Sequence, residues 1–260
     1  MNKKEKSDNR RALPKFLGIM LACMVIGALL GESVGYLGGL TSPEEVKEAV
    51  SGILVRISPW AQWLLAVGFT AAEILLYRKA KRQFASWDGE DEMVMEQAEW
   101  KLSWVLMLTS VHLVLAFTLE GFLQLLGAES LADAVMGLLG FVAAMASCLV
   151  MQQKTVDLTR KMNPEKKGSV YDMKFHKKWM DSCDENERRQ IGQAAYKAFS
   201  VVNGSCVILW LLSVVLGDLL ELGPVPMALI MLIFGINQVS FQAEAMKLAG
   251  HRESDTEKSA

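Results

Sequence analysis

The sequence has few of the residues from which metal, disulfide and redox sites are usually built. Its three histidines lie in three different segments, and its four cysteines show no paired spacing. This pattern argues against a zinc framework and against a disulfide scaffold. We therefore expect no metal ligand and no cofactor-binding residue.

Catalytic fingerprints are missing as well. The sequence has no His-Glu-x-x-His helix, no Gly-x-Ser-x-Gly elbow, no phosphate-binding Gly-rich loop and no dinucleotide fingerprint. The histidines His112, His176 and His251 are too scattered to suggest a catalytic group. We therefore expect that the protein is not an enzyme, and we assign no catalytic residue.

Long apolar runs dominate what is present. The chain is 52% hydrophobic, and the apolar residues come in runs of about 18 to 25, the length that crosses a bilayer as a helix. These runs predict a single integral-membrane domain over residues 1–260. The six predicted spans are about 16–40, 60–78, 102–125, 133–152, 198–222 and 227–246.

Lysine and arginine are almost absent from one side of this arrangement. The N-terminal tail, the segments 78–101 and 153–197, and the C-terminal tail carry six, five, eleven and three of the 27 basic residues, which leaves only Lys47 and Arg56 elsewhere. By the positive-inside rule, this asymmetry places both termini in the cytoplasm of a multi-pass protein of the cell membrane.

The order of spans predicts an all-α, six-helix transmembrane bundle built from three helical hairpins. The insertion 153–197 would form a small helical cytoplasmic cap. A weak echo between 68–72 and 140–144, Gly-Phe-Thr-Ala-Ala against Gly-Phe-Val-Ala-Ala, favours reading the hairpins as repeats, although small-residue matches also arise by chance. The Ser-Pro-Glu-Glu start at 42–45 predicts a short amphipathic helix in the outer interface, ending before Pro59.

The first span carries glycines at four-residue spacing, namely Gly27, Gly31, Gly35 and Gly39. They form a strip of about 18 Å along one helix face. In lipid, such a strip lets a second helix approach closely. The alternative is that glycine is simply common in membrane helices.

Ionisable residues within spans are functional candidates. The candidate polar intramembrane site consists of Glu32, Glu73, His112, Glu120 and Asp218. The alternatives are structural: Glu32, Glu120 and Asp218 would be solvated at the outer interface, and His112 would form an inter-helix hydrogen bond. Glu73 would pair with Arg78 or with a neighbouring helix.

The cytoplasmic insertion carries an aromatic face. Tyr171, Phe175 and Trp179 recur every four residues, as on one side of a helix. This face would pack on the 79–101 segment or on the membrane surface, or receive a protein partner. The insertion has eleven basic and seven acidic residues, a balance that topology alone explains, so we expect no nucleic-acid binding.

The run 162–179, Met-Asn-Pro-Glu-Lys-Lys-Gly-Ser-Val-Tyr-Asp-Met-Lys-Phe-His-Lys-Lys-Trp, followed by Asp-Ser-Cys-Asp-Glu at 181–185, resembles a bacterial family of multi-span membrane proteins known as a domain of unknown function. The hairpin layout agrees over most of the chain. The resemblance implies a bacterial plasma membrane and brings no activity or catalytic residues.

Two classes of function follow. The first is a non-enzymatic accessory, sensor or immunity protein that works through a partner at the cytoplasmic cap. The second is a small secondary transporter of a cation or cationic solute, which the intramembrane acids favour. The lipid bilayer is the one partner that the sequence itself indicates. The sequence does not indicate an oligomeric state.

Overall fold

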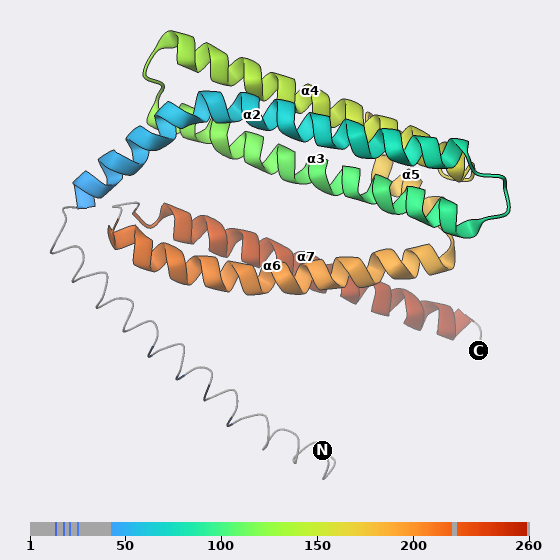
Figure 1. Ribbon diagram of the computed structural model, residues 1–260. Helices are drawn as coiled ribbons and strands as arrows, with labels where there is room; N and C mark the ends of the chain where they lie inside the picture. The colour runs from blue at the N-terminus through green and yellow to red at the C-terminus, as the bar shows by residue number, and fades with distance from the viewer. Residues whose placement is uncertain are drawn as a thin grey trace. The chain divides into compact units, whose positions relative to one another are not determined.

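The computed structural model describes residues 43–219 and 223–258 and, before them, the isolated positions 14, 18, 21 and 25. Within these residues the secondary structure is entirely helical (Figure 1). The helices are α2 (Pro43–Ala85), α3 (Glu92–Leu126), α4 (Leu131–Met162), α5 (Phe175–Asp181), α6 (Glu185–Leu219) and α7 (Val225–Lys258). The glycine strip and Glu32 lie outside the described residues.

Five of the described helices are long and apolar enough to cross a membrane. Their spanning parts are Lys47–Ala85, Glu92–Leu126, Leu131–Met162, Glu185–Val214 and Val225–Lys247. Each overlaps one of the predicted spans after the first. The prediction of an all-helical chain with several membrane-compatible helices is confirmed for this part of the sequence.

The chain divides into two compact units, residues 49–191 and residues 1–48 with 192–260. The first unit contains α3, α4, α5 and most of α2. The second contains most of α6 and all of α7. The arrangement as three repeated hairpins is not tested by these units and stays a prediction.

Helix α2 is longer than the sequence suggested. We predicted an interfacial helix that ends before Pro59 and a separate span after it, but one helix runs through both. Proline is tolerated inside membrane helices because nearby hydroxyl groups and packed neighbours compensate for the lost N–H. Here both Ser58 and Pro59 are fully buried, so packed neighbours hold the helix together at this point; the Ser58 hydroxyl bonds the Leu54 carbonyl at 2.6 Å, not the Val55 carbonyl that Pro59 leaves without its usual N–H donor.

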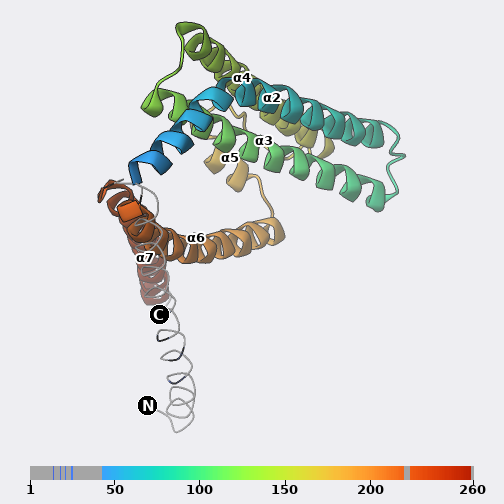
Figure 2. The same ribbon diagram turned by 60° about the vertical axis from the view of Figure 1, so that its left-hand side comes forward.

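Helices α2, α3 and α4 lie side by side in both views (Figures 1 and 2). Their buried positions recur at three- and four-residue spacing, the pattern of one helix face. On α3 this face consists of Ala98, Leu102, Val105, Thr109, His112, Ala116 and Leu123. The stripe mixes small, polar and apolar residues, as expected where helices pack in lipid.

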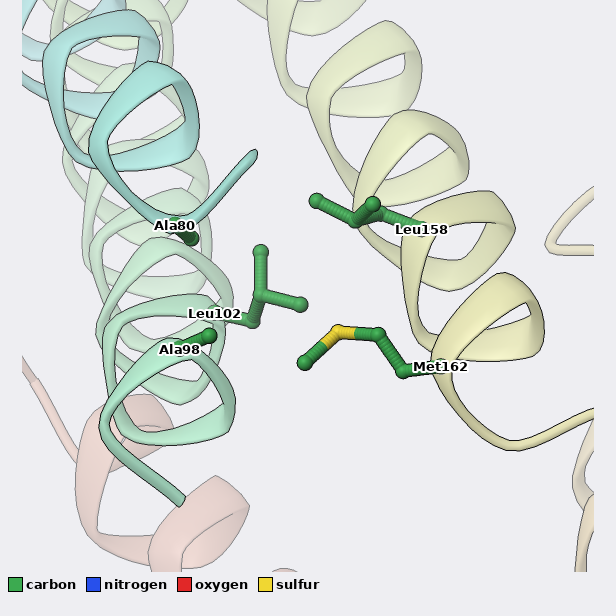
Figure 3. Packing of buried hydrophobic residues seen from close by; sticks show 5 residues of the cluster. All are labelled: Ala80, Ala98, Leu102, Leu158 and Met162. Atoms are coloured by element: carbon green, nitrogen blue, oxygen red, sulfur yellow. The ribbon is translucent and has the colours of Figure 1, made fainter. Parts of the chain in front are cut away.

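Two apolar clusters join the three helices. Near one end, Ala80 of α2 and Ala98 and Leu102 of α3 meet Leu158 and Met162 of α4 (Figure 3). Further along, three alanines meet, one from each helix, with Phe141 packed against them; they are Ala66, Ala116 and Ala144. Alanine at these contacts lets the helix backbones approach closely.

Gly140 of α4 lies against side chains of α2. A methyl group at this position would lie 2.9 Å from Cγ of Gln62 and 3.3 Å from Cδ1 of Trp63. Gly68, its counterpart in the sequence echo, is exposed, and a methyl group there would meet nothing within 4 Å. The two glycines therefore occupy different environments despite their similar neighbours in the sequence.

The segment between α4 and α6 is fastened to both of these helices. The side-chain oxygen of Gln153 accepts hydrogen bonds from the Ser169 hydroxyl at 3.0 Å and from the Val170 amide at 2.9 Å. Asp184 and Glu187 cap α6 reciprocally, each side chain accepting from the other's amide, which satisfies two amide groups at the helix start. We call residues 163–184 the cap.

In the second unit, α6 and α7 form a helical hairpin. The Phe199 and Phe241 rings stack with centroids 4.3 Å apart, and Asn237 donates to Asn203 at 3.0 Å. Gly223, in the connection, has φ of 66°, a left-handed conformation that glycine adopts without steric cost. These contacts agree with the last of the predicted hairpins.

Candidate functional site

One polar residue from each helix of the α2–α4 bundle meets at a single point. Nδ1 of His112 on α3 lies 3.3 Å from Oε1 of Glu73 on α2 and 3.3 Å from Sγ of Cys148 on α4. The thiol also lies 3.6 Å from the Thr109 carbonyl oxygen, to which it donates. We call Glu73, His112 and Cys148 the polar cluster.

The polar cluster is shut off from solvent. Glu73 and His112 have no exposed surface, and Cys148 is 1% exposed. Among the residues that the structure describes, two buried polar atoms of the cluster, Oε2 of Glu73 and Nε2 of His112, have no hydrogen-bond partner. A buried polar atom without a partner costs about 1–3 kcal/mol, so a cluster that leaves two of them calls for an explanation.

Further polar side chains line the same buried face. Thr109 donates to the Leu106 carbonyl at 2.8 Å and accepts from Gln152 of α4 at 3.5 Å. Gln62 of α2 is fully buried and donates to the Ala116 carbonyl at 3.2 Å. The bundle therefore has a partly polar interior, which is costly in lipid and hence a functional hypothesis.

Of the five predicted intramembrane residues, the structure brings two together. Glu73 and His112 are in contact, so Glu73 is matched by a neighbouring helix, as one of our two alternatives held. Glu120 lies two turns further along α3, about 12 Å from His112 along the axis, and accepts a hydrogen bond from Gln124 at 2.9 Å. Glu32 lies outside the described residues, as does the side chain of Asp218.

Cys148 and Gln62 are not among the residues that the sequence predicts for this site. Cys148 has no paired cysteine in the sequence, and its partners in the structure, His112 and the Thr109 carbonyl, come from another helix. One signal was available. Gly140, Ala144 and Cys148 follow one another at four-residue spacing, so Cys148 shares the small-residue face that packs against α2 and α3.

The donor atoms of the polar cluster are chemically diverse and close together. A carboxylate oxygen, an imidazole nitrogen and a thiol sulfur lie within 4.8 Å of one another, the set from which a metal ion can be held. The same atoms can also hold a proton between Glu73 and His112 in a hydrogen bond. The arrangement can thus hold a ligand or a proton, although the sequence had suggested no metal ligand.

Two hollows lie at the junction between the cap and the bundle. A hollow of about 270 Å³ lies between α3, α4 and the start of α6, and one of about 600 Å³ lies between α4 and α5. Trp179 lines both hollows. The junction is therefore loosely packed around one aromatic side chain.

The predicted aromatic face is shorter than expected. Phe175 and Trp179 are half-buried on α5 with ring centroids 5.6 Å apart. Tyr171 lies before the helix and is 66% exposed. Asp172 explains the late start of α5, because its carboxylate accepts from the Lys174 amide at 2.8 Å and so stabilises a turn.

A buried ion pair closes the cap. Lys166 is only 4% exposed and pairs with Glu187 at the start of α6. Burial alone lowers the pKa of Lys166, but the hydrogen bond and the charge of Glu187 outweigh it, so the pKa is raised above its usual value. Lys166 is therefore held charged inside the cap.

We expect Trp179→Ala to loosen the cap. The half-buried indole lines both hollows and its ring contacts Phe175, so its loss should destabilise this region by about 2 kcal/mol. Limited proteolysis should then cut within 163–184 faster than in the wild type. Tyr171→Ala, which removes an exposed ring nearby, should leave the cleavage rate unchanged; equal cleavage in the two variants would show that the indole does not hold the cap.

Comparison with known proteins assigns the chain to a family but indicates no activity. No curated protein and no solved structure matches it. A family model described as "Protein of unknown function (DUF3169)" matches residues 10–243. This match spans the described bundle, the cap, α6 and the first part of α7, so the chain belongs to the DUF3169 family of proteins of unknown function.

Proposed function

We propose that the protein is a non-enzymatic sensor located in the bacterial cell membrane. Among the accessory, sensor and immunity roles that the sequence favours, this proposal selects the sensor role. The polar cluster is the sensing element, and the cap passes its state to a cytoplasmic protein partner. One observation carries this proposal: α4 holds both the Cys148 thiol and the Gln153 side chain to which the cap is anchored.

The distance between these two points on α4 is short. Five residues separate them, which is about 7.5 Å along a helix. Between them, Gln152 contacts Thr109 on α3 at 3.5 Å. Because a packed helix moves as a rigid element, a change in how α4 sits against His112 would shift the anchor of the cap.

The distribution of basic residues supports a signal that runs from the polar cluster to the cytoplasm. By the positive-inside rule, the cap lies in the cytoplasm. It presents the fully exposed Met173 and the exposed Tyr171 beside Lys174 and Lys177. Exposed apolar side chains among basic ones are suited to contact with a protein partner.

Hydrogen–deuterium exchange of purified protein tests the coupling. Glu73→Gln keeps the shape of the side chain and removes its charge, so the contact with His112 should weaken and α4 should shift. We expect amide exchange within 163–184 to rise about fivefold, which corresponds to a local loosening of about 1 kcal/mol.

Ser110→Ala is the matched control. Ser110 lies two residues from His112, is exposed, and bonds only to the Leu106 carbonyl of its own helix. Its replacement should leave exchange in the cap unchanged. If Glu73→Gln also leaves the cap unchanged while exchange near residue 112 rises, the cluster and the cap are not coupled and the sensor proposal fails.

A small secondary transporter of a cation is the alternative, and the buried Glu73–His112 pair favours it. A carrier must open this closed site to each side in turn. Reconstituted into proteoliposomes, a transporter would show cation or proton flux that Glu73→Gln abolishes. A sensor would show no flux with either protein.

A further inference from the structure

The polar cluster resembles a metal site in its donor set and its spacing. We propose that Glu73, His112 and Cys148 bind one divalent cation of the zinc class, through Oε1, Nδ1 and Sγ. The inference concerns these three side chains alone and does not depend on whether the cap responds to them.

The spacing of the donor atoms fits a tetrahedral ion. Zinc bonds of about 2.0–2.3 Å imply donor-to-donor distances of about 3.4 Å for nitrogen and oxygen and about 3.6 Å for nitrogen and sulfur. The measured separations from Nδ1 are 3.3 Å to the carboxylate oxygen and 3.3 Å to the sulfur. All three donors lie within 4.8 Å of one another, so small side-chain movements suffice to surround an ion.

Net charge selects the class of ion. A thiolate and a carboxylate carry two negative charges, which one divalent ion neutralises; a monovalent copper ion would leave one negative charge buried in the bundle. Magnesium and calcium prefer six or more oxygen ligands, whereas this site offers one carboxylate beside nitrogen and sulfur. Zinc accepts this mixture of donors.

Binding would also resolve the unpartnered carboxylate atom. Oε2 of Glu73 has no hydrogen-bond partner in the closed cluster, and both carboxylate oxygens can approach a metal ion. On binding, the Cys148 thiol loses its proton to water and becomes a thiolate, and Nδ1 of His112 presents its lone pair rather than a hydrogen. The ion would then tie α2, α3 and α4 together.

Metal analysis and cobalt substitution test this proposal on tag-free protein from cells grown with added zinc. We expect about one zinc ion per chain. Zinc content should fall at least tenfold in Cys148→Ser and in His112→Gln. With Co²⁺ in place of zinc, the wild type should show thiolate-to-cobalt charge-transfer absorption, and Cys148→Ser should lack it.

Matched controls separate this site from surface binding. Cys206→Ser and His176→Gln remove a cysteine and a histidine that lie far from the cluster in the sequence, and both variants should keep the zinc and the cobalt absorption. A chain with Cys23, Cys183 and Cys206 replaced by serine retains Cys148 alone and should bind as the wild type does, which decides the matter if Cys148→Ser does not fold. Absent cobalt–thiolate absorption in this single-cysteine chain, or full zinc content in a folded Cys148→Ser protein, would overturn the proposal.

Discussion

Replacing His112 with leucine should lower the stability of the detergent-solubilised protein by about 3 kcal/mol, because removing one partner of a buried pair leaves the other unsatisfied. Glu73 has no exposed surface, and His112 is the partner of its Oε1 atom. Thermal unfolding of purified protein measures this effect. Hydrogen bonds between membrane helices are often worth only about 0.6 kcal/mol, so a loss near 3 kcal/mol would mark a charged contact.

The double variant Glu73→Leu/His112→Leu distinguishes a broken pair from a general packing defect. With both polar groups gone, neither member of the pair leaves the other unsatisfied, and much of the lost stability should return. Ser110→Leu, on the exposed side of α3, should be close to neutral. If the two single losses simply add in the double variant, Glu73 and His112 do not interact in the folded protein.

Gly140→Leu should destabilise the bundle by about 3 kcal/mol, because there is no room for a side chain between α4 and α2. Even one carbon atom at Gly140 would lie 2.9 Å from Gln62, and that side chain is fully buried and hydrogen-bonded to Ala116. The Gln62 side chain would have to move, and its hydrogen bond would be lost. Thermal unfolding of the purified variant measures the effect.

Gly68→Leu is the control, since it makes the same chemical change in a helix of the same bundle. A methyl group at Gly68 meets nothing within 4 Å, and leucine favours a helix over glycine by about 0.8 kcal/mol. This variant should therefore match or exceed the wild type in stability. Equal losses at the two positions would mean that α4 does not approach α2 at Gly140.

Much of the architecture was predictable because apolar run length is a local property. The five described helices that are long and apolar enough to cross a membrane each overlap a predicted span. The continuous α2 was not predictable from the same cues. A proline ends or kinks most helices in soluble proteins, but Pro59 is buried and packed within the bundle, and α2 continues through it.

The polar cluster was only half predictable. An ionisable residue inside a span draws attention wherever it lies, and this rule found Glu73 and His112. It could not show that they touch, because 39 positions separate them and no sequence signal sets the register between α2 and α3. Cys148 was missed for the same reason, since a lone cysteine becomes informative only once its neighbours in space are known.

In the cap, the aromatic spacing predicts a helix that begins too early, because it does not take the turn before Phe175 into account. Four-residue spacing alone placed Tyr171 on the same helix as Phe175. Gly168, with φ of 129°, and the turn held by Asp172 delay the helix to Phe175. The hydrogen bond from Lys178 lowers the pKa of Asp172 below its usual value. The hydrogen bond from the Lys174 amide and the positive charge of Lys178 act in the same direction, so the Asp172 carboxylate in this turn stays charged.

Helices α3 and α4 bring their polar residues together inside one bundle. Cross-linking tests this arrangement in a chain whose Cys23, Cys183 and Cys206 are replaced by serine, leaving Cys148. Thr109 is fully buried, faces Gln152 of α4, and has its carbonyl oxygen 3.6 Å from the Cys148 sulfur. Thr109→Cys makes a small change and puts a second thiol on the buried face of α3 that contacts α4 beside Cys148, where a disulfide can be tested.

After mild oxidation and denaturation, free thiols are counted by mass with a maleimide reagent. We predict that the Thr109→Cys chain keeps no free thiol and stays monomeric on a non-reducing gel. Ser110→Cys, one residue further on the exposed side of α3, should keep both thiols free. Two free thiols in both variants would contradict the convergence of α3 and α4 at Cys148, and with it the sensor and metal proposals.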